Sequence, residues 1–307
     1  MQATETSTVP ESPGEVESPG PAKPRAAETY NLLPAHRTLS EPTRGWQLVN
    51  VSELWRYREL LFFLIWRDVK VRYKQTVLGV LWAFIQPAML MVVFTFVFNR
   101  LGGLSSGDIP YPLFALSGLL AWTFFSSAVN QAGASVVGSE RLISKIYFPR
   151  LIVPLASIGA TVVDFAIALS LLAVLMIAYG VAPGWQIVLA PAVFAILLLT
   201  AVGIGTFLAA LNVTYRDVKY VIPFLLQVGM YATPTIYMVV PDDASEKLRW
   251  LVDFNPLANL IEGFRACVLG GPIPWTGLGF SLIVAILVCV GGCLYFRKVE
   301  DNFADVI

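Results

Sequence analysis

The 307-residue sequence is poor in the residues that most enzymes use for catalysis. It has one histidine, His36, and three cysteines that form no CxxC pair. His36 lies in a proline-rich tail, so the body of the chain has neither a Ser–His dyad nor an HExxH metal site. Acidic metal-binding repeats are missing, since Asp242 and Asp243 form an isolated pair, and no GxxxxGK[ST] loop is present to bind ATP. We therefore expect no catalytic residue, no metal site and no cofactor bound by this chain.

Charged residues are also scarce. They make up 14% of the sequence, hydrophobic residues make up 56%, and the mean hydropathy is +0.68. A soluble domain is about one quarter charged, so this composition indicates an integral membrane protein. The formal net charge is zero, which argues against a nucleic-acid partner.

One stretch combines a cluster of positive charge with a long apolar run. Four basic residues face a single acid, Asp68, in the segment that we call the collar: Arg67, Lys70, Arg72 and Lys74. The run Val77–Phe98 follows with no charge, and about 22 residues at ~1.5 Å each cross a ~30 Å hydrocarbon core. Positive residues beside a span stay in the cytoplasm, which places the collar there.

Six apolar runs are long enough or nearly long enough to span a membrane. They cover residues 77–98, 111–137, 151–179 and 185–211, a proline-interrupted run that starts near Val221, and residues 275–296. Counting crossings from the collar puts about 13 basic residues inside and about 4 outside, which supports cytoplasmic termini by the positive-inside rule. We predict an all-α integral membrane protein with six transmembrane helices.

Three domains are predicted along the chain. Residues 1–45, with seven prolines, indicate a disordered cytoplasmic tail. Residues 46–76 hold the collar and an amphipathic helix in the membrane interface at about Val51–Leu64, with Leu54, Tyr57, Leu61 and Leu64 on one face. This helix also fits the packed first helix of a small cytosolic domain. Residues 77–307 form the six-span domain, in which the external segment 241–274 is expected to contain short helices that dip back into the outer face of the membrane.

Polar residues inside the spans are candidates for packing or functional sites. The second span contains Ser126, Ser127, Asn130 and Gln131, which we expect at helix contacts or along a cavity, since lipid cannot satisfy them. Asp164 is the one acid well inside a span, and no basic residue in the membrane is available to pair with it. A structural role and a role toward substrate or protons both stay open for Asp164.

Four segments together resemble a known family. They are RDVKVRYKQTVLGVLWAFIQPAMLMVVFTFVF at 67–98, SERLISKIYFPRLIVPLA at 139–156, NVTYRDV at 212–218 and FNPLANLIEGFR at 254–265. In order and spacing they resemble the ABC-2 type permeases, and more narrowly the branch that exports polysaccharides, O-antigens and teichoic acids.

The resemblance implies a transport subunit rather than an enzyme. It implies a homodimer in the bacterial inner membrane, with two copies of a separate cytoplasmic ATPase subunit that carry the ATP and Mg. The implied cargo is a lipid-linked polysaccharide of the O-antigen, teichoic-acid or cell-wall galactan type, moved from the cytoplasmic to the outer face. An ABC-2 exporter of a small lipophilic compound and a membrane enzyme acting on a polyprenyl-linked sugar are the alternatives.

The resemblance also implies roles for particular residues. Partner coupling falls to the collar residues Arg67, Lys70, Arg72 and Lys74 and to Glu140, Arg141 and Lys145 in the second cytoplasmic helix, expected over 140–147; a basic collar also binds anionic membrane lipids. The path between the subunits would be lined from the first and fifth spans by Trp82, Phe94, Phe98, Phe224, Tyr231 and Tyr237. The external gate would include Asn255, Glu262 and Arg265.

Overall fold

The computed structural model describes residues 51–74, 79–101, 109–235, 254–300 and 303, and all of them belong to one compact unit, Gly45–Ile307. The described residues form helices and no strand. The predicted tail 1–45 lies outside them. The elements are α1 (Val51–Arg56), α2 (Arg58–Lys74), the 3-10 turn η1 (Gly79–Leu81), α3 (Trp82–Phe94), the π-helical turn η2 (Thr95–Leu101), α4 (Tyr111–Gly138), α5 (Glu140–Ile143), α6 (Ile152–Tyr179), the 3-10 turn η3 (Trp185–Leu189), α7 (Ala190–Thr214), α8 (Val218–Ala232), α10 (Pro256–Leu269) and α11 (Trp275–Glu300).

Five segments are long and apolar enough to cross a membrane, and they confirm five of the six predicted spans. They are Gly79–Phe98, Tyr111–Gly138, Ile152–Tyr179, Trp185–Thr214 and Trp275–Glu300. Where the fifth predicted span begins, α8 is apolar but has only 15 residues. It ends just before Thr233 and Pro234, and the rest of that run lies outside the described residues.

α4 is the central helix. In its most apolar 18-residue window 78% of the residues are buried, against 6% in the first span. Phe124 of α4 lies beside Phe165 of α6 and Phe194 of α7, with ring centroids 5.4 and 4.8 Å apart, and Phe264 of α10 lies 5.8 Å from Phe165. This aromatic cluster joins four helices into one core.

Small residues let the long helices approach closely. A Cβ added to Gly205 of α7 would lie 2.8 Å from the Cβ of Ala132 of α4. At the crossing of α7 and α11, a Cβ on Gly203 would lie 2.5 Å from the backbone nitrogen of Cys289. Neither position has room for a larger side chain unless a helix moves.

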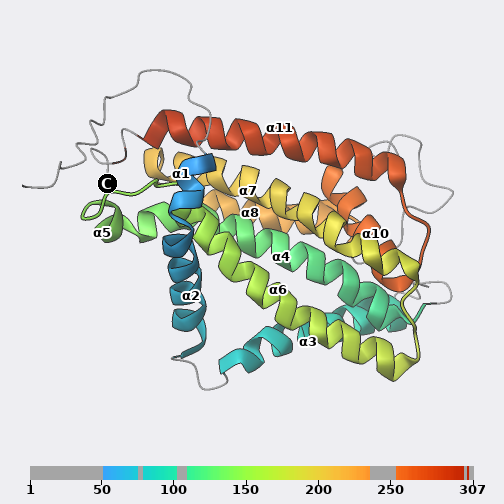
Figure 1. Cartoon of the computed structure of the whole chain (residues 1–307). Helices are drawn as coiled ribbons and strands as arrows, with labels where there is room; N and C mark the ends of the chain where they lie inside the picture. Colours follow the sequence, from blue (N-terminus) through green and yellow to red (C-terminus); the bar gives the residue numbers. More distant parts are fainter. Residues whose placement is uncertain (1–50, 75–78, 102–108, 236–253, 301–302, 304–307) are drawn as a thin grey trace, which may run out of the picture. The chain divides into compact units, whose positions relative to one another are not determined.

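The helix ends gather in two groups (Figure 1). α1, α5 and the carboxyl-terminal end of α11 lie at one end of the bundle, and α10 lies at the other. α2 runs across the long helices at the first end. α10 begins at Asn255, whose side chain accepts from the amides of Leu257 and Ala258, and it ends at Gly270 with a φ of 83°, a conformation that favours glycine.

Two helices differ in length from their predicted bounds. The interfacial helix predicted up to Leu64 continues through the whole collar to Lys74. The helix predicted over 140–147 is shorter, since α5 ends at Ile143 and turns follow. Pro149 does not set this end, because a proline restricts the residue directly before it, Phe148, and Phe148 lies beyond the end of α5.

Candidate functional site

α2 has two apolar faces. Leu64 is buried against Ile152 and Val153 at the start of α6, and Leu54, Tyr57 and Leu61 pack in the same cluster as the helical pattern predicts. On the other side Phe62, Phe63 and Trp66 are exposed. A helix that is held by the bundle and still exposes large apolar side chains is suited to the membrane interface.

The collar residues do not all face outward. Lys70 and Lys74 are exposed, and Arg67 pairs with its neighbour Asp68 at 2.8 Å. Together with the exposed Glu140, Arg141 and Lys145 after α4, they lie at the end of the bundle that holds α5, which we call the inner end (Figure 1). Arg67 and Arg141 line one groove of about 810 Å³, so the structure brings two of the predicted coupling segments together.

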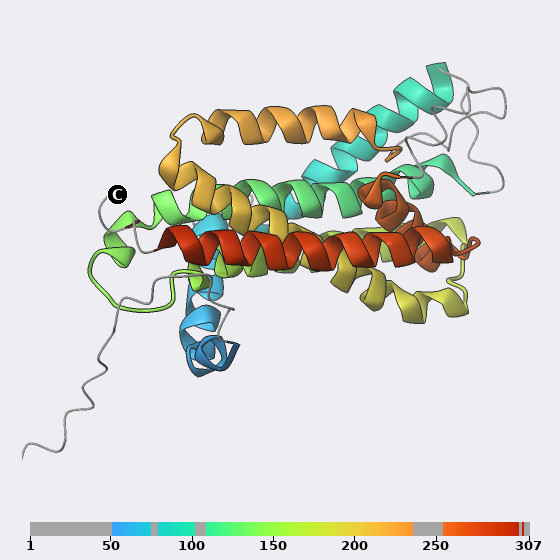
Figure 2. The same ribbon diagram turned by 90° about the horizontal axis from the view of Figure 1, so that it is seen from above.

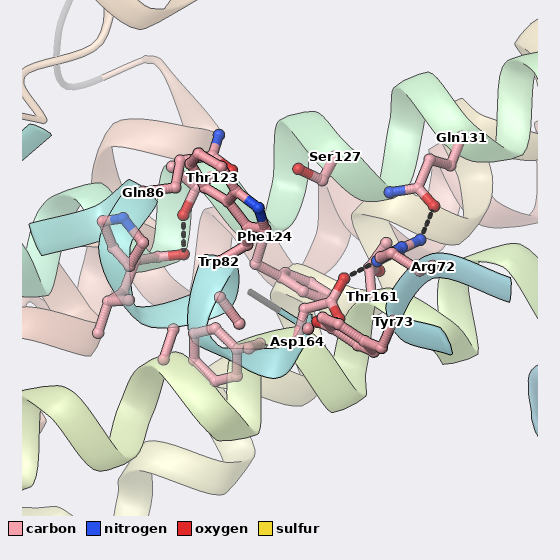
Figure 3. A pocket seen from close by; sticks show the side chains of 16 residues that line it. Arg72, Tyr73, Trp82, Gln86, Thr123, Phe124, Ser127, Gln131, Thr161 and Asp164 are labelled. Atoms are coloured by element: carbon pink, nitrogen blue, oxygen red, sulfur yellow. Dashed lines mark hydrogen bonds and ion pairs between the residues drawn. The ribbon is translucent and has the colours of Figure 1, made fainter. Parts of the chain in front are cut away.

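Arg72 points into the bundle instead (Figure 3). Its guanidinium forms an ion pair with Asp164 of α6 and donates a hydrogen bond to the Oε1 of Gln131 of α4. The hydroxyl of Tyr73 donates to the other oxygen of Asp164. The prediction that Asp164 has no basic partner is therefore wrong, because a long side chain on a helix outside the spans reaches it.

Burial shifts the pKa values of Arg72 and Tyr73 in this cluster. Burial lowers the pKa of Arg72 from its usual value, while Tyr73 and Asp68 act to raise it. Burial also raises the pKa of Tyr73, so its hydroxyl keeps the proton that it donates to Asp164. The ion pair and the two hydrogen bonds of this cluster fasten α2 to α6 and α4.

A cavity of about 390 Å³ opens beside this cluster, between α3, α4 and α6. Its polar lining includes Trp82 and Gln86 of α3 and Thr123 and Ser127 of α4, and Figure 3 shows these side chains around the same space as Arg72 and Asp164. Pro87, Leu120, Phe124, Phe165 and Ala168 supply an apolar wall. The expectation that polar residues of the second span line a cavity is thus confirmed for Ser127 and Gln131.

α3 and α8 lie on the same side of α4 (Figure 2). Trp82, Phe224 and Tyr231, three of the predicted path residues, are exposed, while Phe94 and Phe98 are half-buried and stack at 5.8 Å. Tyr237 lies outside the described residues. Between α4 and α8 a groove of about 240 Å³ is lined by polar side chains that include Ser126, Asn130 and Gln227. The path-lining role stays a prediction, and three of its residues are exposed on helices that lie on one side of α4 (Figure 2).

The predicted gate residues lie at the opposite end of the bundle, within and beside α10. The Nδ2 of Asn255 donates to the Oγ1 of Thr233 at 3.2 Å. The Nη2 of Arg265 donates to the carbonyl oxygen of Thr235 at 2.7 Å, and its guanidinium lies 3.8 Å from the ring centre of Phe114. Burial lowers the pKa of Arg265 to about 10, so it stays protonated at neutral pH beside the half-buried Glu262. These contacts tie α10 to the end of α8.

A comparison with known protein families matches residues 59–269 to the ABC-2 type transporter family. The chain belongs to this family. An ABC-2 protein is a membrane component of a transporter, which agrees with the apolar helices and with the lack of catalytic side chains in the sequence.

This ABC-2 chain aligns with almost the whole length of several curated relatives. An O-antigen export system permease protein RfbA of Myxococcus xanthus is 35% identical over 84% of this chain and 98% of its own. A protein of the same name from Klebsiella pneumoniae is 27% identical over 81% and 95%. A polysialic acid transport protein KpsM of Escherichia coli is 24% identical over 78% and 92%.

One further cluster in this ABC-2 chain was not predicted from any sequence pattern. Arg297 of α11 pairs with Glu53 of α1 at 3.2 Å and with Glu300 at 3.4 Å. Glu300 accepts from the backbone amide of Arg150 at 3.0 Å, and the Arg150 side chain donates to the Glu300 carbonyl oxygen. We call these four residues the inner-end network. It joins segments 244 positions apart, and no local pattern reveals such a pairing.

Proposed function

We propose that this chain is the membrane-spanning permease subunit of an ATP-driven exporter. It moves a lipid-linked polysaccharide from the cytoplasmic to the outer face of a bacterial inner membrane. Relatives named for O-antigen export and polysialic acid transport cover most of this chain and support a glycan as cargo. ATP and Mg bind to a separate ATPase subunit.

The observation that carries the proposal is the incomplete face of α3, α4 and α8. The first span has 6% of its apolar window buried, and α8 exposes Phe224, Leu225 and Tyr231. Between these helices Ser126 and Asn130 of α4 line the groove. Polar side chains at membrane depth are satisfied by protein or by a water-filled path and not by lipid.

A second copy of the chain would complete this face. Two copies that meet across α3 and α8 would enclose a path with polar groups from α4 and aromatic rings from the helices on either side. Sugars place their apolar faces on aromatic rings, so such a path suits a glycan. In this arrangement α8 belongs to the fifth predicted span, both termini are cytoplasmic, and α10 closes the outer mouth.

Depletion of the protein tests the cargo. We expect one long polyprenyl-linked polymer to accumulate on the cytoplasmic side of the membrane, measured by analysis of membrane glycolipids. Loss of the polymer with no trapped precursor would indicate a synthetic enzyme instead, and unchanged glycans would indicate a small lipophilic cargo.

Charge reversal of Lys70 and Lys74 tests the docking of the ATPase. Both side chains are exposed on α2 and have room to contact a partner. We expect Lys70→Glu with Lys74→Glu to reduce recovery of the ATPase subunit in a detergent pull-down at least about tenfold, since like charges at an interface cost several kcal/mol. Lys219→Glu, on the exposed start of α8, is the control, and equal recovery from all variants would refute docking on the collar.

A further inference from the structure

The Arg72 cluster separates two cavities. Arg72 and Gln131 line the interior cavity of about 390 Å³, and the same two residues line the groove of about 810 Å³ at the inner end. The Arg72–Gln131 hydrogen bond therefore lies where a polar group would pass from the cytoplasmic groove into the bundle.

The interior cavity has balanced charge. Among the described residues that line it, Arg72 is the one cation and Asp164 is the one anion. The two side chains are 29% and 26% exposed, so a ligand in the cavity has access to both. In the structure the carboxylate of Asp164 is bound to the guanidinium of Arg72.

The carboxylate of Asp164 binds the guanidinium of Arg72 at the place where a phosphate group could bind. A guanidinium binds carboxylate and phosphate oxygens with the same paired N–H groups. The remaining polar lining (Trp82, Gln86, Gln131, Thr123 and Ser127) consists of neutral side chains that can donate hydrogen bonds to phosphate or to sugar hydroxyls. The apolar wall, which includes Pro87, Leu120 and Phe165, offers no side-chain hydrogen bond and fits the first carbons of a lipid chain.

We propose that Arg72 binds the phosphate headgroup of a lipid and that Asp164 is a built-in competitor, displaced when that headgroup enters the cavity. This inference rests on the proposed function in one respect, the assignment of the headgroup to the lipid-linked substrate. Displacement breaks the ion pair, which is one of several contacts that tie α2 to α6. Tyr73 continues to hold Asp164, because it donates to the carboxylate oxygen that faces away from the ion pair.

The competitor role predicts an improvement in binding that no structural role would produce. Asp164→Asn keeps the shape of the side chain and removes its charge, so Arg72 becomes available. We expect it to bind farnesyl phosphate at least about threefold more tightly than the unaltered protein, because the carboxylate charge that competes for Arg72 is gone. Arg72→Gln combined with Asp164→Asn replaces the ion pair by two neutral amides and should weaken binding about tenfold without leaving a buried charge unpaired.

The measurement is equilibrium binding of farnesyl phosphate to the full permease–ATPase complex in nanodiscs of neutral phosphatidylcholine. Farnesol, which lacks the phosphate, should bind at least about tenfold more weakly. Arg216→Gln is the matched control, because it removes one exposed cytoplasmic charge outside both cavities and should leave the affinity unchanged. Equal or weaker binding by Asp164→Asn, or equal loss in Arg216→Gln, overturns the proposal.

Competition identifies the source of the headgroup. Excess inorganic phosphate should displace the probe weakly, because it makes no use of the apolar wall. Nanodiscs that contain phosphatidylglycerol should lower probe binding only slightly if the site is built for the substrate. Full displacement by phosphatidylglycerol overturns that assignment. The assay measures no export, so a failure of the glycan proposal in the depletion experiment is seen separately.

Discussion

The crossing of α7 and α11 offers a test in which two neighbouring residues should respond oppositely. A Cβ added to Gly292 would meet the carbonyl group of Gly203, with the carbonyl carbon at 2.9 Å, and the Oγ1 of Thr206 at 3.1 Å. A Cβ added to Gly291 would meet nothing within 4 Å. Gly292→Ala and Gly291→Ala make the same chemical change on the same helix, so they differ only in what the new methyl group touches.

The size of the effect follows from two terms. Alanine favours a helix over glycine by roughly 1 kcal/mol, and this gain is common to both variants. Forcing an extra carbon into a packed contact costs about 1–3 kcal/mol, and only Gly292→Ala pays it. We therefore expect Gly292→Ala to be less stable than Gly291→Ala by about 1–3 kcal/mol.

The assay is unfolding of the purified protein in detergent micelles by titration with sodium dodecyl sulfate, followed by circular dichroism. The difference in free energy between the two variants is the quantity of interest, since the propensity gain cancels. Equal stability of the two variants would refute the close crossing, and a less stable Gly291→Ala would place the tight face of α11 elsewhere.

Two further perturbations test contacts between distant segments. Arg297→Gln removes the ion pair with Glu53, which contributes about 1 kcal/mol or less at a partly exposed site. The backbone amides of α1 should therefore exchange hydrogen up to about fivefold faster, measured by mass spectrometry. Unchanged exchange would mean that the inner-end network does not hold α1. Asn212→Ala removes the buried 2.9 Å hydrogen bond to the Gly133 carbonyl and should cost about 1–2 kcal/mol in the detergent titration, with exposed Thr214→Ala as the control that should change little.

The spans were predictable because lipid imposes a length. Runs of about 20 or more uncharged residues have few alternatives, and the predicted 151–179 and 111–137 differ from α6 and α4 by one residue at an end. α8 shows where this signal fails. Its run is broken by Pro223, Thr233 and Pro234, and hydropathy cannot tell where a broken run leaves a helix.

The candidate site was predictable only in its separate parts. The collar, the polar residues of α4 and Asp164 each stood out in the sequence, but their meeting depends on how α2 lies across the bundle. Tyr73 and Asp164 are 91 positions apart, and the direction of α2 is set by the packing of Leu64 on α6. No periodicity within either helix contains that information.

The pairing of Asp164 bears on the roles that the sequence left open. Asp164 pairs with the guanidinium of Arg72 and accepts a hydrogen bond from the hydroxyl of Tyr73, so both partners come from α2. A carboxylate on an accessible arginine is what competition with an anionic ligand requires. The competitor role therefore makes ligand binding the first measurement to make on Asp164, ahead of the pH dependence of transport.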